Sequence, residues 1–187
     1  MINVQRHDLW ATPVWQFDLD LDPTPIEKEC YTYEQLRAGK PQTNYDWHEN
    51  TPYTHIKGML DLVEQLSPTW YKEMGVKDRY SGKIENFWIN INGPGRFNKA
   101  HLHPDSIFTG VYYARSLPNA GNIVLHNTPD REFALQTYTD KPTPLNITNP
   151  NFEPKLGRVY IFPSWLSHSV DSNMSGTDRI SISFHFN

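Results

Sequence analysis

Two residues near the middle of the chain and one nearer its end are of the types that bind transition metals. His103 and Asp105 stand two positions apart, and residues two apart in an extended segment point to the same side. His168 follows 65 positions later (168 − 103) and can supply a third ligand from another strand. Two imidazoles and one carboxylate, with the remaining coordination positions open, favour Fe(II).

Neighbouring residues add to this pattern and leave one alternative open. Arg179 lies eleven positions after His168 (179 − 168), and its planar guanidinium could grip a dicarboxylate. His101 could replace Asp105 as a ligand beside His103, but we prefer Asp105, because a carboxylate offsets the charge of the metal. In a chain with eight histidines, a His-x-Asp arises by chance about one time in three. The metal-site interpretation therefore depends on all of these residues taken together and not on the His-x-Asp motif alone.

The segments around these residues indicate the elements that must position them. Over 54–74, apolar residues recur at spacings of three and four, which predicts an amphipathic helix interrupted at Ser67-Pro68. A second helix is expected to begin at Pro25, with Thr24 as its cap. Beyond residue 82 the chain becomes rich in β-branched and aromatic residues, which predicts strands over 84–92, 106–114, 122–126, 157–162 and 179–186.

This order of elements predicts a mainly β fold with a helical N-terminal prologue. We expect a single domain over 1–187, in which 1–80 form the mixed prologue and 82–187 form a jelly-roll core. The segment 127–154 has five prolines and few apolar residues, and we interpret it as a lid over a site.

The composition narrows the possible partners and the compartment. The net charge is −4 and the basic residues are scattered, so the sequence does not predict the basic patch that a nucleic-acid-binding surface needs. No apolar run is long enough to span a bilayer, and the polar N-terminus has no signal-peptide core. The one cysteine, Cys30, cannot form an internal disulfide. We therefore expect a soluble, cytoplasmic protein that binds neither nucleic acid nor membranes.

Taken together, three motifs resemble those of the iron(II)/2-oxoglutarate-dependent oxygenase superfamily, especially its prolyl-hydroxylase-like branch. They are His103-Pro-Asp105, His168-Ser-Val170 and Arg179-Ile-Ser181. Three longer segments are similar to a bacterial and phage family of such oxygenases: 9–15, 88–90 and 101–113. The resemblance spans nearly the whole chain and says little about the substrate.

The resemblance implies a double-stranded β-helix, a cupin-like jelly roll, in which His103, Asp105 and His168 bind Fe(II). It implies a dioxygenase that uses 2-oxoglutarate and dioxygen to hydroxylate a substrate, releasing succinate and carbon dioxide. A peptidyl residue is the leading substrate class, with a small metabolite close behind.

The resemblance also assigns residues to the cosubstrate. Arg179 would form a bidentate salt bridge with the far carboxylate of 2-oxoglutarate. Ser181, two residues later on the same strand face, would add a hydrogen bond. Tyr113, or Tyr112 if the strand register is shifted, matches the position of a tyrosine that contacts the cosubstrate.

Two rival interpretations belong to other classes of protein. One is a cupin-like metalloenzyme that does not use 2-oxoglutarate and would tolerate the loss of Arg179. The other is a non-enzymatic jelly-roll module, with a structural or binding role, in which the histidines are incidental. It predicts no stoichiometric metal and an intact fold when His103 and His168 are both replaced.

Overall fold

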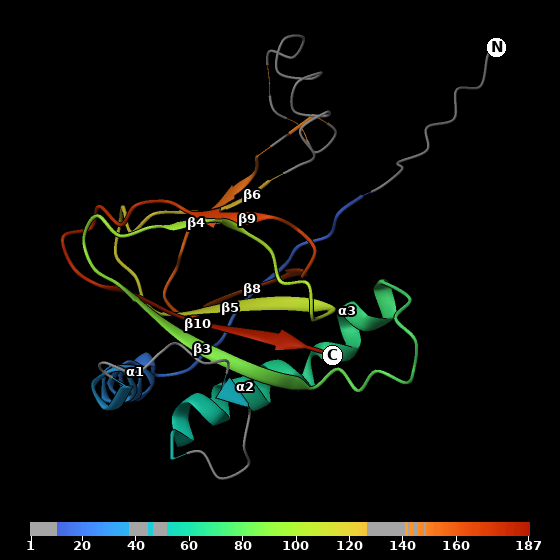
Figure 1. Ribbon diagram of the computed structural model, residues 1–187, viewed down its shortest axis with the longest axis horizontal. Coiled ribbons are helices and arrows are strands. Elements are labelled where there is room, and N and C mark those ends of the chain that lie inside the picture. Colours follow the sequence, from blue (N-terminus) through green and yellow to red (C-terminus); the bar gives the residue numbers. More distant parts are fainter. Residues whose placement is uncertain are drawn as a thin grey trace.

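The computed structural model describes residues 11–37, 45–46, 52–126, 141, 143, 146–147 and 149–187. Two antiparallel sheets face each other, and the helices lie against the outer face of the larger sheet (Figure 1). This arrangement confirms the predicted fold class, a mainly β jelly roll with a helical prologue. Most of the segment that we interpret as a lid lies outside the described residues.

Among the described residues, the larger sheet has the strand order β1-β8-β5-β10-β3-β2. The smaller sheet has the order β4-β9-β6-β7. The strands of the larger sheet are β1 (Trp15–Asp18), β2 (Tyr45–Asp46), β3 (Ile84–Asn92), β5 (Phe108–Arg115), β8 (Arg158–Pro163) and β10 (Arg179–Phe186). Those of the smaller sheet are β4 (Asn98–His101), β6 (Ile123–Leu125), β7 (Asn151–Phe152) and β9 (His168–Val170).

Strand β10 lies at the centre of the larger sheet and separates two environments. It pairs with β5 on one side and β3 on the other. Alternate residues on a strand point to opposite faces. Its apolar residues, Ile180, Ile182, Phe184 and Phe186, are fully buried in the core beneath the helices. Its other face, which begins with Arg179, looks toward the smaller sheet.

Three helices cover the outer face of the larger sheet: α1 (Pro23–Arg37), α2 (Thr54–Gln65) and α3 (Ser67–Glu73). The break between α2 and α3 lies at the predicted position, since Pro68 cannot continue the helical hydrogen bonding. Helix α1 begins two residues before the predicted start, because the Asp22 carboxylate accepts a hydrogen bond from the Thr24 N–H (3.0 Å). Among the described residues, no helix is long and apolar enough to cross a membrane.

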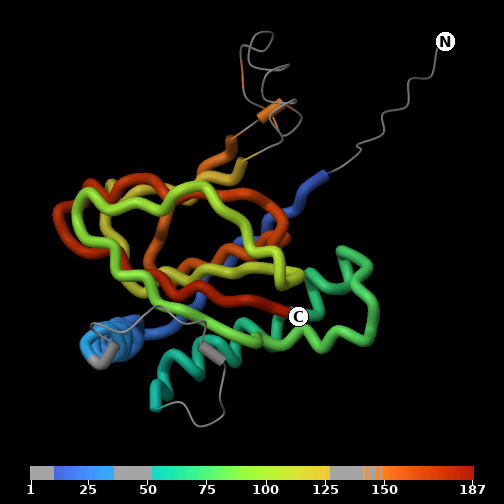
Figure 2. Tube along the Cα trace, in the orientation of Figure 1, coloured from blue at the N-terminus to red at the C-terminus, as the bar shows by residue number. Residues whose placement is uncertain are grey.

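Two apolar clusters hold these layers together, and the tube view shows the two sheets as separate layers of the chain (Figure 2). The larger cluster joins the helices to the outer face of the larger sheet. Packing there is close at Gly110, where an added Cβ would overlap the Phe184 ring and approach Ile161 Cδ1 to 2.7 Å. The smaller cluster lies between the two sheets and includes Tyr113 and Phe162. The polar pocket described next lies beside it.

Candidate metal centre

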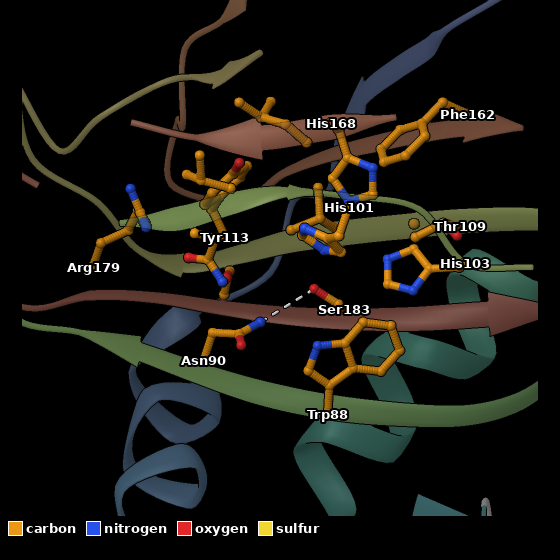
Figure 3. Close-up of a pocket in the computed structure, with 16 residues that line it drawn as sticks. Trp88, Asn90, His101, His103, Thr109, Tyr113, Phe162, His168, Arg179 and Ser183 are labelled. Atoms are coloured by element: carbon orange, nitrogen blue, oxygen red, sulfur yellow. Dashed lines mark hydrogen bonds between the residues drawn. The ribbon is translucent and has the colours of Figure 1, made fainter. Parts of the chain in front are cut away.

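Three imidazoles meet between the two sheets. Strand β4 pairs with β9 in a register that places His101 opposite His168, and His103 follows just after β4 ends. Their ring centroids are 4.3 Å (His101–His168), 5.1 Å (His101–His103) and 5.1 Å (His103–His168) apart. One nitrogen from each ring lies within 4.8 Å of the others. Figure 3 shows the three rings gathered at one side of a shared pocket.

Backbone carbonyls orient two of these rings. The Nδ1 atom of His101 lies 2.7 Å from the Lys99 carbonyl oxygen, and that of His168 lies 3.0 Å from the Leu166 carbonyl oxygen. A carbonyl can only accept, so each Nδ1 carries a hydrogen, and Nε2 is then the nitrogen whose lone pair a metal could use. A histidine that binds a metal through one ring nitrogen usually donates a hydrogen bond from the other nitrogen in this way.

Burial keeps two of the clustered histidines, His103 and His168, neutral. Desolvation is the main cause that lowers the pKa of His103 to about 3, and the neighbouring histidines lower it further. Desolvation likewise lowers the pKa of His168 to about 4, although the Leu166 carbonyl opposes the shift. A neutral imidazole is the form that binds a metal. The imidazoles of His103 and His168 are therefore ready to bind a metal ion at neutral pH.

Asp105 is not part of this group. It lies in a turn with Pro104, its side chain is exposed, and its backbone carbonyl accepts a hydrogen bond from Asn187 Nδ2 (3.2 Å). The alternation that aligns His101 with His103 ends at this turn, because Pro104 interrupts the extended path. Among the described residues, the structure thus brings His101 to His103 and His168, and leaves Asp105 beside the cluster.

Arg179 lies elsewhere in the same pocket and is 1% exposed. Its Nη1 donates to the carbonyl oxygens of Ala120 (2.6 Å), Gly121 (3.2 Å) and Asp171 (3.3 Å). Among the described residues, its buried Nε has no hydrogen-bond partner. Burial lowers the pKa of the guanidinium, but an arginine stays charged in proteins. The guanidinium is thus a buried cation whose Nη1 is bound to neutral carbonyls and whose Nε–H is unpaired. Such a group is suited to bind a carboxylate ligand.

Tyr113 and Ser181 line the same pocket as Arg179. They are partners in the β5–β10 register, both are buried, and both line the pocket (Figure 3 labels Tyr113). Burial raises the pKa of the Tyr113 phenol, which therefore remains a hydrogen-bond donor. Tyr112 points the other way, into the core beneath the helices, so the structure favours Tyr113.

The sequence assigned other residues near the site to neither the metal nor the cosubstrate. Asn90 Nδ2 donates to Ser183 Oγ across the pocket (3.3 Å). The His185 ring lies 4.5 Å from that of His103 and 4.7 Å from that of Trp88, measured between centroids. The alternation of β10 was the signal that could have found Ser183 and His185, because both share the face of Arg179.

The donor set agrees with a resident transition metal. Imidazole nitrogens suit iron, copper, nickel and zinc, and three ligands from one side leave coordination positions for a cosubstrate. The unpartnered Arg179 Nε marks a place for an anion in the same pocket. Phe162 and Val170 form part of the apolar wall around this pocket. The residues present therefore fit a metal ion together with a carboxylate-bearing molecule.

Comparison with known proteins agrees with this chemistry. Residues 86–185, from β3 to β10, match a family described as "Putative 2OG-Fe(II) oxygenase". No curated protein matches the sequence.

Solved structures share the fold at low identity. A prolyl-4-hydroxylase from Pseudomonas putida is 17% identical, with a TM-score of 0.61 over 96% of this chain and 90% of that one. A prolyl hydroxylase from Trichoplax adhaerens, in complex with a peptide fragment of hypoxia inducible factor, is 15% identical (TM-score 0.63; 92% and 83% covered). The epimerase SnoN, in complex with Fe3+, alpha ketoglutarate and nogalamycin RO, is 9% identical (TM-score 0.60; 93% and 78% covered).

Proposed function

Since this chain belongs to the family of 2OG-Fe(II) oxygenases, we propose that it hydroxylates a C–H bond of a peptidyl residue or a small metabolite. In the balanced reaction, one 2-oxoglutarate and one dioxygen are consumed. One oxygen atom enters succinate, the other enters the substrate, and carbon dioxide leaves. Iron, when bound, supplies the redox chemistry that activates dioxygen. The observation that carries the proposal is the buried Arg179, with its unused Nε, in the pocket of the three histidines.

We propose that His101, His103 and His168 hold the iron. The Nδ1 hydrogen bonds of His101 and His168 fix their rings and leave Nε2 for the metal. His103 contributes a third neutral imidazole. This set replaces the carboxylate of the expected site with an imidazole, so the ligands bring no negative charge to the metal. The dianionic cosubstrate would then supply the charge that offsets Fe(II).

The cosubstrate is bound by the opposite part of the pocket. Arg179 would bind the far carboxylate of 2-oxoglutarate by donating hydrogen bonds from Nε and its neighbouring amino group, in the planar geometry that suits a carboxylate. Tyr113 and Ser181 are close enough to this end of the pocket to add hydrogen bonds from their hydroxyls. The three carbonyls that bind Nη1 hold the guanidinium in place before the cosubstrate arrives.

Both substrate classes have support among the structural neighbours. The Trichoplax adhaerens prolyl hydroxylase was solved with a peptide, and SnoN was solved with the small molecule nogalamycin RO. In this chain a hollow of about 610 Å³ adjoins the histidine cluster, within the range of about 300–1,000 Å³ that is usual for ligand pockets.

The test of the metal site compares His101→Ala with Asp105→Ala. Anaerobic calorimetric titration with Fe(II) should give one bound ion for the wild type and for Asp105→Ala. His101→Ala should bind iron at least tenfold more weakly, since it removes a ligand. Succinate release coupled to 2-oxoglutarate consumption then tests the reaction itself. Loss of iron binding in Asp105→Ala, with His101→Ala unaffected, would reject the three-histidine site.

A further inference from the structure

The hollow that adjoins the histidine cluster is continuous with the metal pocket. The two share five lining residues: Trp88, Asn90, Asn98, His101 and His103. The cosubstrate end, with Arg179 and Tyr113, belongs only to the inner pocket. A molecule in the outer hollow would therefore reach the metal from the side that the cosubstrate does not occupy. We call this hollow the outer cleft.

The outer cleft is acidic. Glu85 and Asp105 line it and both are exposed, whereas no Lys or Arg of the described segments is among its lining residues. Within the described part of the chain, neither carboxylate takes part in an ion pair of 4.0 Å or less. Asn187 connects the two residues, since its Nδ2 donates to Glu85 Oε2 (2.7 Å) and to the Asp105 carbonyl (3.2 Å).

The guanidinium of Arg79 borders a separate hollow. Arg79 shares that neighbouring hollow with Glu85 and Asp105, but it does not line the outer cleft. Its guanidinium lies over the Tyr80 ring, 4.9 Å from the centroid, and Nη2 donates to the Tyr80 hydroxyl (3.0 Å). Both carboxylates are exposed to a molecule in the cleft, although Glu85 Oε2 also accepts the hydrogen bond from Asn187 and Asp105 also acts on the nearby His185 ring.

An aromatic ring lies at the junction of the cleft and the metal pocket. Trp88 lines both, and its ring centroid lies 5.3 Å from that of His103 (Figure 3). The face of a tryptophan attracts cations, because its quadrupole is negative there. Two carboxylates together with an indole form the kind of surface that recognises an organic ammonium or guanidinium group.

We propose that the substrate carries a cationic amine or guanidine group, which binds between Glu85 and Asp105 near Trp88. The inference rests on the proposed function, since the outer cleft is a substrate site only if the histidine cluster holds the catalytic metal. It also explains a role for Asp105: because three neutral imidazoles bind the metal, this carboxylate remains free to select the substrate.

The test uses two probes of equal shape, choline and its neutral isostere 3,3-dimethylbutan-1-ol. Full-length protein is loaded with Mn(II) and 2-oxoglutarate, and the paramagnetic relaxation of the probe methyl protons is measured by NMR. Each carboxylate should favour the cation by about fourfold, for charges about 5 Å apart in a water-like dielectric. The wild type should therefore relax choline several-fold more than the isostere.

A double variant and a control variant test whether Glu85 and Asp105 cause the preference for choline. The double variant Glu85→Gln/Asp105→Asn should bring the choline-to-isostere ratio close to one. Asp20→Asn, an exposed carboxylate beyond β1, makes the same change of charge elsewhere and should leave the ratio unchanged. A peptide with trimethyl-lysine serves as a third probe. Stronger relaxation of the peptide than of choline indicates a peptidyl substrate, and equal relaxation indicates a small metabolite.

The outcomes separate the two proposals. If Mn(II) binds and both isosteric probes relax equally, the cationic substrate class is wrong and the proposed function stands. A ratio that persists in the double variant also overturns the inference, because the selectivity then has another source. If neither Mn(II) nor 2-oxoglutarate binds, the proposed function fails, and the substrate class fails with it.

Discussion

Replacing Arg179 with methionine should weaken the binding of 2-oxoglutarate strongly while leaving Fe(II) binding intact. Methionine fills much of the same volume without a charge or a donor. The side chain lines the inner pocket but contributes no ligand to the histidine cluster. The two functions of the pocket should therefore separate in this variant.

The magnitude follows from the environment of the guanidinium. Arg179 is 1% exposed, so in the Arg179→Met variant the far carboxylate of 2-oxoglutarate would lie in a buried pocket without the cation that pairs with it. Truncating one member of a buried, hydrogen-bonded charge pair costs about 2–5 kcal/mol. That range corresponds to an increase of about 30-fold to 5,000-fold in Kd.

The same change should also lower the thermal stability. Three carbonyls lose a donor, those of Ala120, Gly121 and Asp171, and an unsatisfied buried acceptor costs about 1–3 kcal/mol. Removing a buried charge offsets part of this loss. A Tm measurement therefore accompanies each binding experiment, and titrations are made well below the transition.

The assay is anaerobic titration of the Fe(II)-loaded protein with 2-oxoglutarate, followed by visible charge-transfer absorption. Arg179→Lys is the matched control, since it keeps the charge but loses the planar fork. It should bind with an affinity between those of the wild type and Arg179→Met. An unchanged affinity in a folded, iron-loaded Arg179→Met would refute the assignment and place the far carboxylate elsewhere.

Three further predictions concern stability and reactivity. Gly110→Ala should lower the free energy of unfolding by about 1–3 kcal/mol, because its Cβ would overlap the Phe184 ring; an unchanged Tm would contradict this. The metal-free protein should lose stability as the pH falls from about 6.5 toward 4, since the unfolded chain binds protons there and the folded chain does not. His168, with its pKa lowered to about 4, should account for about 2 kcal/mol at pH 5. A Tm that stays flat between pH 7 and 5 would refute the stated burial of this histidine and of His103, whose pKa is about 3. The buried Cys30 thiol, with its pKa raised to about 12, should resist iodoacetamide at pH 8 until denaturant is added, as mass spectrometry would show.

Periodicity predicted the parts of the fold that have one buried face. The run over 179–186 alternates between apolar and polar residues, and β10 has the predicted bounds. Strand β3 likewise matches 84–92. Strands β4 and β9 were not predicted, because they are short and polar and owe their pairing to each other. Membership of the oxygenase family excludes the non-enzymatic rival and supports the use of 2-oxoglutarate.

The metal site shows where sequence reasoning stops. The residue types and the segments were visible, and the sequence offered both His101 and Asp105 as partners for His103. The geometry that favours His101 in our proposal comes from the turn at Pro104, where Asp105 is exposed, and from the register that places His101 opposite His168. Neither the path of a turn nor a pairing across 67 positions (168 − 101) can be derived from local spacing.

One face of β10 belongs to the core and the other lines the pocket. The strand pairing that buries the core therefore also places the residues of the site. If this strand slipped by one residue against its neighbours, Arg179, Ser181, Ser183 and His185 would enter the apolar layer beneath the helices. Four apolar side chains would take their places in the pocket. Such a chain could not bury its core, so a folded but misaligned form would not accumulate. Inactive variants of these pocket-facing residues that keep the native Tm can therefore be interpreted as chemical losses and not as misfolding.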